Sequence, residues 1–171
     1  MLKNSRRLSL LKLNKLYSLS QLTKIVQEHK KRGQRVVLTN GCFDLIHAGH
    51  IRYLKESKRK GDILVVALNS DSSIRKLKGK GRPILNQKER VEILSSFYFV
   101  DYITFFKEKN VEKVLLSLKP DIHAKGSDYT KETVPEKETV KAYGGKIAIT
   151  GGPKIRSTSQ LIEKIVLGTK K

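Results

Sequence analysis

Five short apolar runs alternate with segments of helical pattern along this chain, and the alternation limits the choice of fold more than any other feature. Strands that alternate with helices are typical of βαβ units, in which the strands lie parallel. The first run contains Val36, Val37 and Leu38 in succession, as expected of a strand buried on both faces. The runs span residues 35–39, 63–68, 102–105, 121–124 and 146–150. We therefore expect an α/β fold, a doubly wound five-stranded parallel sheet of Rossmann-like type.

The helices are predicted from apolar spacing and from signals at their ends. Three segments have the spacing of a capping box: Ser18-x-x-Gln21, Asn86-x-x-Glu89 and Ser157-x-x-Gln160. Glycines directly follow several of the predicted helix ends, as is common at a C-terminus. The predicted helices span residues 18–32, 47–60, 71–77, 86–97, 111–118, 135–143 and 157–167.

The chain length of 171 residues suits one domain with a single core. We expect a basic N-terminal extension over residues 1–17 and one domain over residues 18–171. Lys12 and Lys15 interrupt the leucine-rich start and no small-residue cleavage site follows, which argues against a signal peptide. No apolar run approaches the roughly 18 residues of a membrane span. We therefore expect a cytoplasmic protein without membrane contact, and the single cysteine, Cys42, excludes an internal disulfide.

The charge balance points to anionic partners. Lysine and arginine number 36 against 16 aspartate and glutamate, a formal net charge of +20. Nucleic acid is one candidate, and a nucleotide together with a sugar phosphate is another. Because the lysines are spread over the whole chain and no nucleic-acid motif is present, we expect no nucleic-acid partner. A basic nucleic-acid-binding module remains the distant alternative, and it predicts affinity that falls steeply with salt.

The densest motif follows the first strand and opens a helix. In a doubly wound sheet, ligands bind at the carboxyl ends of the strands, where this motif lies. Gly41 allows a tight turn, and the helix start offers free N–H groups and a positive dipole end to an anion. His47 and His50 are three residues apart, so both rings lie on one face of the first turn. Two such donors can hold a triphosphate and stabilise charge that develops at its α-phosphate.

Three further elements follow later strands. Lys78, Lys80 and Arg82 alternate with glycines in a loop that can close over phosphates. The second element is Lys125-Gly126-Ser127-Asp128-Tyr129, in the loop expected after the fourth strand, and the third is Ser157-Thr158-Ser159 at the last helix start. Each has a structural alternative: a solvated basic loop, an ordinary turn, and helix capping alone.

Three single residues near these elements also have two interpretations. Arg90, on the helix after the basic loop, is either structural or reaches the same phosphates. His123, in the short fourth strand, either faces a sugar or is a satisfied core histidine. Cys42 is expected to be a buried, inert thiol, because nothing else in the sequence suggests thiolate chemistry.

The order and spacing of the motifs identify a family resemblance between about residues 19 and 165. The segments that carry it are Thr39–His50, Gly61-Asp62, Asn69-Ser70-Asp71, Leu77–Ile84, Lys119-Pro120-Asp121, Lys125–Tyr129, Tyr143-Gly144-Gly145 and Ser157-Thr158-Ser159. They resemble the HIGH-motif nucleotidyltransferase superfamily, which includes cytidylyltransferases, pantetheine-phosphate adenylyltransferase and class I aminoacyl-tRNA synthetases. The sequence is most similar to the adenylyltransferase domain that acts on D-glycero-β-D-manno-heptose 1-phosphate.

This resemblance implies an activity, substrates and a site. The activity is transfer of AMP from ATP to the heptose 1-phosphate, giving ADP-heptose and pyrophosphate for lipopolysaccharide core synthesis. The implied catalytic residues are His47, His50, Lys78 and Arg82. The implied ATP-binding residues are Asn40, Gly41, Cys42, Phe43, His47, Gly49, His50, Lys125, Asp128, Ser157, Thr158 and Ser159. The implied sugar-phosphate-binding residues are Asp44, Lys80, Arg82 and His123.

The resemblance also implies Mg²⁺ held mainly by substrate phosphates, a homo-oligomer such as a dimer, and a separate heptose kinase chain. A sugar phosphate whose second pKa is near ~6 is a dianion at neutral pH, so no general base is required. The alternative enzyme is a cytidylyltransferase for glycerol 3-phosphate or a related alcohol phosphate. Many cytidylyltransferases carry Arg-Thr-x-Gly-Ile before Ser-Thr, whereas this chain has residues 152–156 as Gly-Pro-Lys-Ile-Arg, with Lys154 or Arg156 as substitutes. This departure favours ATP over CTP.

Overall fold

A parallel five-stranded sheet forms the centre of the computed structural model, which describes residues 15–153 and 157–168. Its strand order is β3-β2-β1-β4-β5, and every neighbouring pair is parallel. The strands are β1 (Val36–Gly41), β2 (Ile63–Asn69), β3 (Tyr102–Phe106), β4 (Ile122–Gly126) and β5 (Lys146–Thr150). The expected doubly wound, Rossmann-like α/β fold is therefore confirmed.

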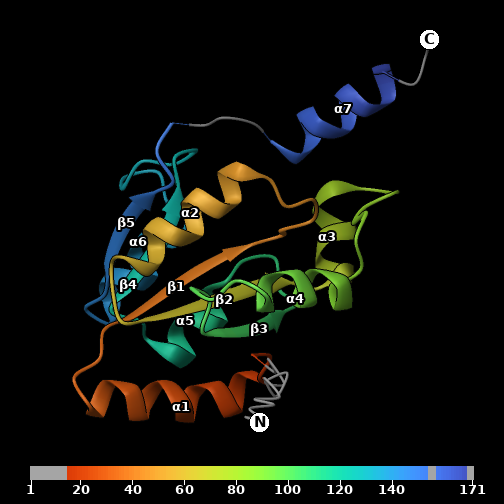
Figure 1. Ribbon diagram of the computed structural model, residues 1–171. Helices are drawn as coiled ribbons and strands as arrows, with labels where there is room; N and C mark the ends of the chain where they lie inside the picture. Colours follow the sequence, from red (N-terminus) through yellow and green to blue (C-terminus); the bar gives the residue numbers. More distant parts are fainter. Residues whose placement is uncertain (1–14, 154–156, 169–171) are drawn as a thin grey trace, which may run out of the picture.

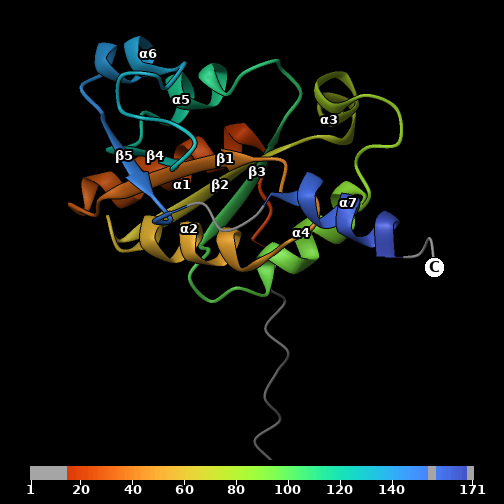
Figure 2. The same ribbon diagram turned by 90° about the horizontal axis from the view of Figure 1, so that it is seen from above.

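Helices cover both faces of the sheet, as Figures 1 and 2 show. The described helices are α1 (Leu19–Lys31), α2 (Ala48–Lys58), α3 (Asp71–Lys78), α4 (Gln87–Ser95), α5 (Glu112–Leu118), α6 (Lys137–Ala142) and α7 (Thr158–Gly168). One core cluster joins α1, α5 and α6 to one face, and a second joins α2 and α4 to the other. Side chains alternate between the two clusters along β2, where Val65 packs in the first and Val66 in the second.

The strand order places the topological switch point beside β1. From β1 the chain builds β2 and β3 on one side of the sheet, then crosses over to build β4 and β5 on the other. Thr39 therefore lies between Val66 of β2 and Ala124 of β4 in the ladder. The connections that leave β1 and β4 diverge to opposite faces, which opens a crevice at the carboxyl ends of these strands.

The structure moves several predicted boundaries. The fourth strand does not end at residue 124 but continues to Gly126, because Lys125 pairs with Ile149 and Gly126 with Thr150 of β5. Lys125 is thus a strand residue, and its expected place in a loop was wrong. The helix expected over residues 86–97 ends at Ser95, and a turn closed from Val100 N to Phe97 O follows.

The three predicted capping boxes are confirmed. Each serine or asparagine side chain accepts a backbone N–H three residues later, and each partner returns the bond. The returning bonds are Ser18 N to Gln21 Oε1 at 3.0 Å, Asn86 N to Glu89 Oε2 at 2.8 Å and Ser157 N to Gln160 Oε1 at 2.7 Å. These pairs define where α1, α4 and α7 begin.

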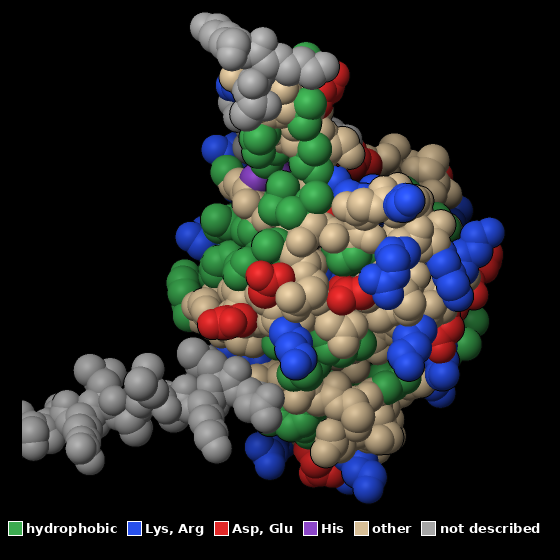
Figure 3. Space-filling view, turned by 90° about the vertical axis from the view of Figure 1, so that its right-hand side faces the viewer, with side chains coloured by type: hydrophobic (Ala, Val, Ile, Leu, Met, Phe, Trp, Pro, Cys, Tyr) green, Lys and Arg blue, Asp and Glu red, His purple; other side chains and the backbone are tan. Residues whose placement is uncertain are grey.

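The two ends of the described chain differ in how they join the body. Most of the expected N-terminal extension, residues 1–14, lies outside the described residues, but residues 15–17 pair with β3, with Tyr17 N donating to Ile103 O. In contrast, α7 extends away from the sheet, buries none of its residues, and exposes Ile165, Val166 and Leu167 (Figure 1). Figure 3 shows its hydrophobic side chains above a face on which lysines and arginines are dispersed. None of the helices in the described segments has the length and apolar character to cross a membrane.

Candidate nucleotide-binding site

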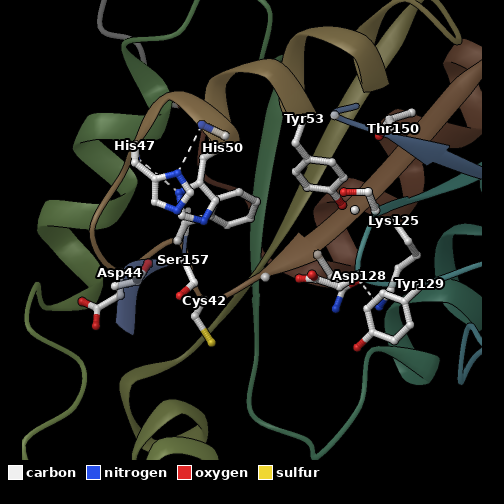
Figure 4. Close-up of a pocket in the computed structure, with 18 of the residues that line it drawn as sticks. Cys42, Asp44, His47, His50, Tyr53, Lys125, Asp128, Tyr129, Thr150 and Ser157 are labelled. Carbon is white, nitrogen blue, oxygen red and sulfur yellow. Dashed lines mark hydrogen bonds between the residues drawn. The ribbon is translucent and has the colours of Figure 1, made fainter. Parts of the chain in front are cut away.

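A pocket of about 400 Å³ opens at the carboxyl ends of β1, β4 and β5. Figure 4 shows its two walls. The first, which we call the histidine wall, is the segment from Cys42 to His50, which comprises the turn after β1 and the first residues of α2. The second, the lysine wall, is formed by Lys125 and by residues 126–129, which follow it. The start of α7 and the basic loop after α3 complete the lining.

The turn after β1 shapes the histidine wall. Phe43 has a left-handed backbone conformation, with φ of 45°, and its ring is 3% exposed. A Cβ atom on Gly41 would lie 3.0 Å from that ring, so glycine leaves the space that Phe43 occupies. The ring centroid of Phe43 lies 5.3 Å from that of His50. Gly41 and Phe43 therefore line the pocket mainly by supporting the histidines.

The two histidines are oriented by backbone hydrogen bonds. The backbone N–H of Gly49 donates to His47 Nδ1 at 3.2 Å, and the N–H of His47 donates to His50 Nδ1 at 3.4 Å. The rings lie together, with centroids 3.9 Å apart (Figure 4). Because each Nδ1 accepts, a neutral ring carries its hydrogen on Nε2. Both histidines then present an Nε2–H donor.

Burial keeps these rings neutral near pH 7. It lowers the pKa of His47, and burial together with neighbouring His47 lowers the pKa of His50 to about 4. The pair thus offers hydrogen bonds rather than positive charge. The positive charge of the pocket lies elsewhere, on Lys78, Arg82 and Lys125.

Asp44 has a different environment from the one expected. Its side chain is 1% exposed, and its Oδ2 lies 2.9 Å from Arg82 Nε. Its Oδ1 accepts the backbone N–H groups of Ile84 and Leu85 at 2.8 and 2.9 Å. The carboxylate thus anchors the basic loop, and with its oxygens occupied it is not available to hold a sugar hydroxyl in this conformation. The sequence did not indicate this role, because Asp44 and Arg82 are far apart along the chain.

The basic loop divides into pocket and solvent residues. Lys78 and Arg82 line the pocket, whereas Lys80, expected at the sugar phosphate, is exposed and does not line it. Gly79 and Gly81, on either side of Lys80, both have φ of 86°, so the loop uses backbone conformations that favour glycine.

Lys125 is the cation of the lysine wall. Its side chain is 7% exposed and reaches the pocket from β4. Its Nζ donates to Asn40 Oδ1 at 3.2 Å, forms an ion pair with Glu136 Oε2 at 3.3 Å, and lies 4.7 Å from the centroid of the Tyr129 ring. Asp128 lines the same wall.

His123 is a core residue, which confirms the core interpretation and corrects the place at the sugar that the resemblance implied. It is fully buried and is not part of the pocket lining. Its Nδ1 lies 3.4 Å from Leu38 O, and its Nε2 lies 3.5 Å from Glu136 Oε2. His123 and Lys125 are two residues apart on β4, so their side chains leave the same face of the sheet. Lys125 is closer to the carboxyl end of the strand, where the pocket opens, and only Lys125 of the two lines it. The contact of His123 with the site is therefore indirect.

Arg90 has a structural role in the folded protein, whereas Cys42 lines the pocket. Arg90 is fully buried; its Nη1 donates to the carbonyl oxygens of Cys42 at 2.7 Å and Asn69 at 2.9 Å, and its Nη2 pairs with Asp71. It supports the turn that carries the histidine wall and does not line the pocket. Cys42 is only partly buried and lines the pocket, so its expected full burial was wrong, although burial raises the pKa of its thiol, as expected of an unreactive cysteine.

The start of α7 closes the pocket on one side. Ser157, Thr158 and Ser159 all line it, and Thr158 Oγ1 donates to Leu45 O at 3.4 Å. Lys154 and Arg156, named as substitutes for the missing arginine, lie outside the described residues.

Most of the predicted site residues therefore meet in one pocket, together with residues that were not predicted. The predicted residues that line it are Asn40, Gly41, Cys42, Phe43, Asp44, His47, Gly49, His50, Lys78, Arg82, Lys125, Asp128, Ser157, Thr158 and Ser159. Sequence reasoning missed the lining residues Tyr53, Thr150 and 151–153, and also Glu136, which lies behind Lys125. Tyr53 is one helical turn beyond His50, a spacing that signals a shared face, whereas nothing in the sequence marks Glu136.

The fold and the pocket together define a Rossmann-like α/β protein with a nucleotide-sized pocket, lined by Lys78, Arg82 and Lys125, at its switch point. The cytidylyltransferase-like family model matches residues 38–159. The chain belongs to this family and is a nucleotidyltransferase.

Relatives and solved structures agree with this assignment. The chain is 42% identical to bifunctional protein HldE of Pelobacter propionicus over 90% of this chain and 31% of the relative. For bifunctional protein HldE of Syntrophotalea carbinolica the identity is 45% over 85% of this chain and 30% of the relative. The chain thus spans about a third of the length of these relatives.

Two solved structures have similar folds. One is a lipopolysaccharide core biosynthesis protein from Thermoplasma volcanium, with 34% identity, a TM-score of 0.57, and coverage of 68% of this chain and 94% of that one. The other is a pantoate-beta-alanine ligase from Francisella tularensis, with 19% identity and a TM-score of 0.57 over 84% of this chain and 68% of that one. The second likeness concerns the fold alone.

Proposed function

We propose that this nucleotidyltransferase transfers AMP from ATP to D-glycero-β-D-manno-heptose 1-phosphate, releasing pyrophosphate and ADP-heptose for lipopolysaccharide core synthesis. The observation that carries the proposal is the pocket, in which a neutral histidine pair, three cations and a hydroxyl-rich helix start surround one cavity. The choice of substrates rests on the motif resemblance, and the names of the HldE relatives and of the lipopolysaccharide core protein accord with it.

The pocket provides hydrogen-bond donors where a triphosphate would carry charge. The Nε2–H groups of His47 and His50 would donate to the α-phosphate, on which negative charge grows during the reaction. The hydroxyls and N–H groups at the start of α7 would bind the β- and γ-phosphates. Lys78, Arg82 and Lys125 would offset the repulsion between the two anionic substrates.

The chemical step needs no proton transfer. The sugar phosphate is already a dianion near neutral pH, so one of its oxygens attacks the α-phosphorus directly. A new oxygen–phosphorus bond forms as the bond between the α-phosphorus and its bridging oxygen breaks, and pyrophosphate leaves with that electron pair. The work of the protein is to align the attack and to stabilise charge.

The described residues fit a magnesium ion that arrives with the triphosphate. No group of three or more histidine, cysteine, aspartate or glutamate side chains in the described part of the chain is placed to hold a metal. Mg²⁺ commonly keeps water ligands and binds through substrate phosphates. When bound, it would neutralise part of the charge of those phosphates.

The proposal is tested by supplying each nucleoside triphosphate, with Mg²⁺, together with the heptose 1-phosphate or with glycerol 3-phosphate. Pyrophosphate and the nucleotide product are measured, and a variant with both histidines replaced by alanine serves as the control. ADP-heptose as the main product is the expected result. Preference for CTP with glycerol 3-phosphate would instead assign the cytidylyltransferase alternative. No turnover with any pair, together with salt-dependent binding to DNA or RNA, would replace the enzyme by a nucleic-acid-binding module.

A further inference from the structure

Lys125 is held in the pocket wall by residues from three separate parts of the chain. Asn40 comes from β1, Tyr129 from the loop after β4, and Glu136 from the residue that precedes α6. A lysine side chain is long and flexible, so each contact that holds it in advance reduces the conformational entropy lost when a ligand binds. Among these three neighbours, only Glu136 carries a full opposite charge.

Glu136 is itself enclosed. It is 4% exposed, and its Oε2 lies 3.3 Å from Lys125 Nζ and 3.5 Å from His123 Nε2. Glu136 is the N-cap residue of α6, yet its side chain makes no capping hydrogen bond there. The carboxylate is directed toward Lys125, and the N-terminus of α6 therefore lacks a side-chain cap.

The charges of the cluster balance when the site is empty. Burial alone would raise the pKa of Glu136, but His123 and the charge of Lys125 lower it to about 2, so the carboxylate is ionised. Burial, with the charge of Lys125, lowers the pKa of His123, and the imidazole is neutral near pH 7. Lys125 and Glu136 then carry one positive and one negative charge. Their position is buried, where an unpaired ammonium group would be unfavourable in free energy.

We propose that Glu136 is a positioning residue for nucleotide binding: its carboxylate, 3.3 Å from Lys125 Nζ, fixes the ammonium group of Lys125 at the pocket wall, ready for the phosphates of the nucleotide. The inference rests on the proposed role of Lys125 as a phosphate ligand. It deepens that role, because it assigns a function to a residue that does not touch substrate.

The first test replaces Glu136 by glutamine, which keeps the shape and removes the charge. Binding of ATP with Mg²⁺ is measured by calorimetry, and KM and kcat are measured with the acceptor that the wild-type protein uses. We expect Kd and KM for ATP to rise about tenfold, the scale of one charge-assisted contact, with a much smaller change in kcat. The matched control is Glu138→Gln, two residues away on the exposed side of α6, which should leave both constants unchanged.

A double-mutant cycle separates positioning from general support of the fold. If Glu136 acts through Lys125, Glu136→Gln should add little to the loss already caused by Lys125→Met. Losses that add fully in the double variant would overturn the proposal, as would an unchanged or tighter Kd in Glu136→Gln. If the glutamine variant does not fold, Glu136→Asp decides, because it keeps the charge and withdraws the carboxylate by one methylene; an unchanged KM there would also overturn the proposal.

The readouts distinguish this inference from the proposed function. ATP binding requires no acceptor, so a wild-type protein that binds ATP but ignores the heptose phosphate would refute the choice of acceptor alone. If the wild-type protein makes ADP-heptose and the Glu136→Gln variant has the same Kd and KM for ATP, the positioning role alone is refuted. Absence of nucleotide binding to the wild-type protein would refute both.

Discussion

The two walls of the pocket are held in place by different kinds of interaction. The histidine wall is contiguous in sequence, and its rings are oriented by backbone N–H groups within the same helix start. The lysine wall depends on side chains from distant segments, with Lys125 and its partner Asn40 separated by 85 positions. The first wall presents neutral donors, and the second presents a paired charge.

This difference teaches how the two walls respond to change. The rings of the histidine wall are oriented by backbone groups of the same segment, so they keep their geometry as long as the turn after β1 stays folded. A wall oriented by side chains depends on each partner, so a single charge removed behind it alters the pocket. We therefore expect substitutions at the histidine wall to affect either the fold or kcat, and substitutions at the cationic positions to affect mainly the binding of nucleotide.

The largest effect is expected beneath the histidine wall. Arg90→Met removes the four hydrogen bonds of the guanidinium group. Asp71 loses the arginine with which it pairs, and the carbonyl oxygens of Cys42 and Asn69 lose the donor that Arg90 supplies. Loss of one member of a buried ion pair commonly lowers the free energy of unfolding by about 3–5 kcal/mol. Urea denaturation followed by circular dichroism measures it, with Arg52→Met on the exposed side of α2 as the control. A loss below about 1 kcal/mol, typical of surface positions, would contradict this role for Arg90.

The next effect is on the chemical step. His47→Ala and His50→Ala should each lower kcat by about 10²-fold, the scale of losing one donor to transition-state charge. The Kd for ATP should change much less, and both variants should retain the circular dichroism spectrum of the wild-type protein. His29→Gln is the control, because His29 contacts Gln34 and Tyr102 outside the pocket. Near-normal kcat in both variants would defeat the assignment of the pair.

A smaller effect is expected at the basic loop. Arg82→Ala removes a pocket cation and the anchor of the loop on Asp44, and should raise KM for ATP about tenfold, as expected for one charge-assisted contact. Lys80→Ala, on the exposed side of the same loop, should leave KM unchanged. Limited proteolysis gives a second measurement: ATP with Mg²⁺ should protect residues 79–85 in the wild-type protein. Equal cleavage rates with and without saturating ligand would rule out closure of this loop over phosphates.

The smallest effect concerns the protonation of His50, which is measured by NMR and by the pH dependence of stability. The pKa of His50 is about 4 in the folded protein and ~6.5 in the unfolded protein. At pH values between these two, His50 binds a proton only when the protein is unfolded. The stability it contributes is therefore fully present above pH 6.5 and is lost as the pH falls toward 4. Nitrogen-15 NMR should show Nδ1 of both pocket histidines unprotonated and Nε2 protonated at pH 7, and His50→Gln should show a shallower decline in stability below pH 6.5. An Nδ1–H tautomer at either ring would contradict the donor geometry of the histidine wall.

Sequence patterns predicted the elements that local chemistry determines. Apolar runs marked the five strands, capping boxes marked three helix starts, and His47 and His50 were placed on one turn by spacing alone. These features depend on residues three or four positions apart, or on burial on both faces of a strand. Such information is present in a single segment of chain.

The roles that depend on tertiary partners were not predicted. Asp44 was expected at the sugar, but its oxygens are taken by Arg82 and the backbone of the loop that follows. For His123 the sequence left a place at the sugar and a place in the core open, and only the fold decides for the core, where its ring lies against Glu136. The end of β4 was predicted wrongly because Lys125 and Gly126 pair with β5, which lies more than twenty residues later in the sequence. Each result depends on which distant segments meet, and spacing within one segment carries no such information.

The central position of β1 has a consequence for how the protein is made. Residues 36–41 leave the ribosome before the other four strands and can pair with β2 soon afterwards, but their other edge stays unpaired until residues 122–126 have been synthesised. Pairing across so many residues is intrinsically slow, and an open strand edge invites association with other chains. The lysine wall, which depends on the same late pairing, is completed only with β4 and the start of α6. In the cell, binding competence and protection from aggregation should therefore be acquired together, once β4 and the start of α6 have been synthesised.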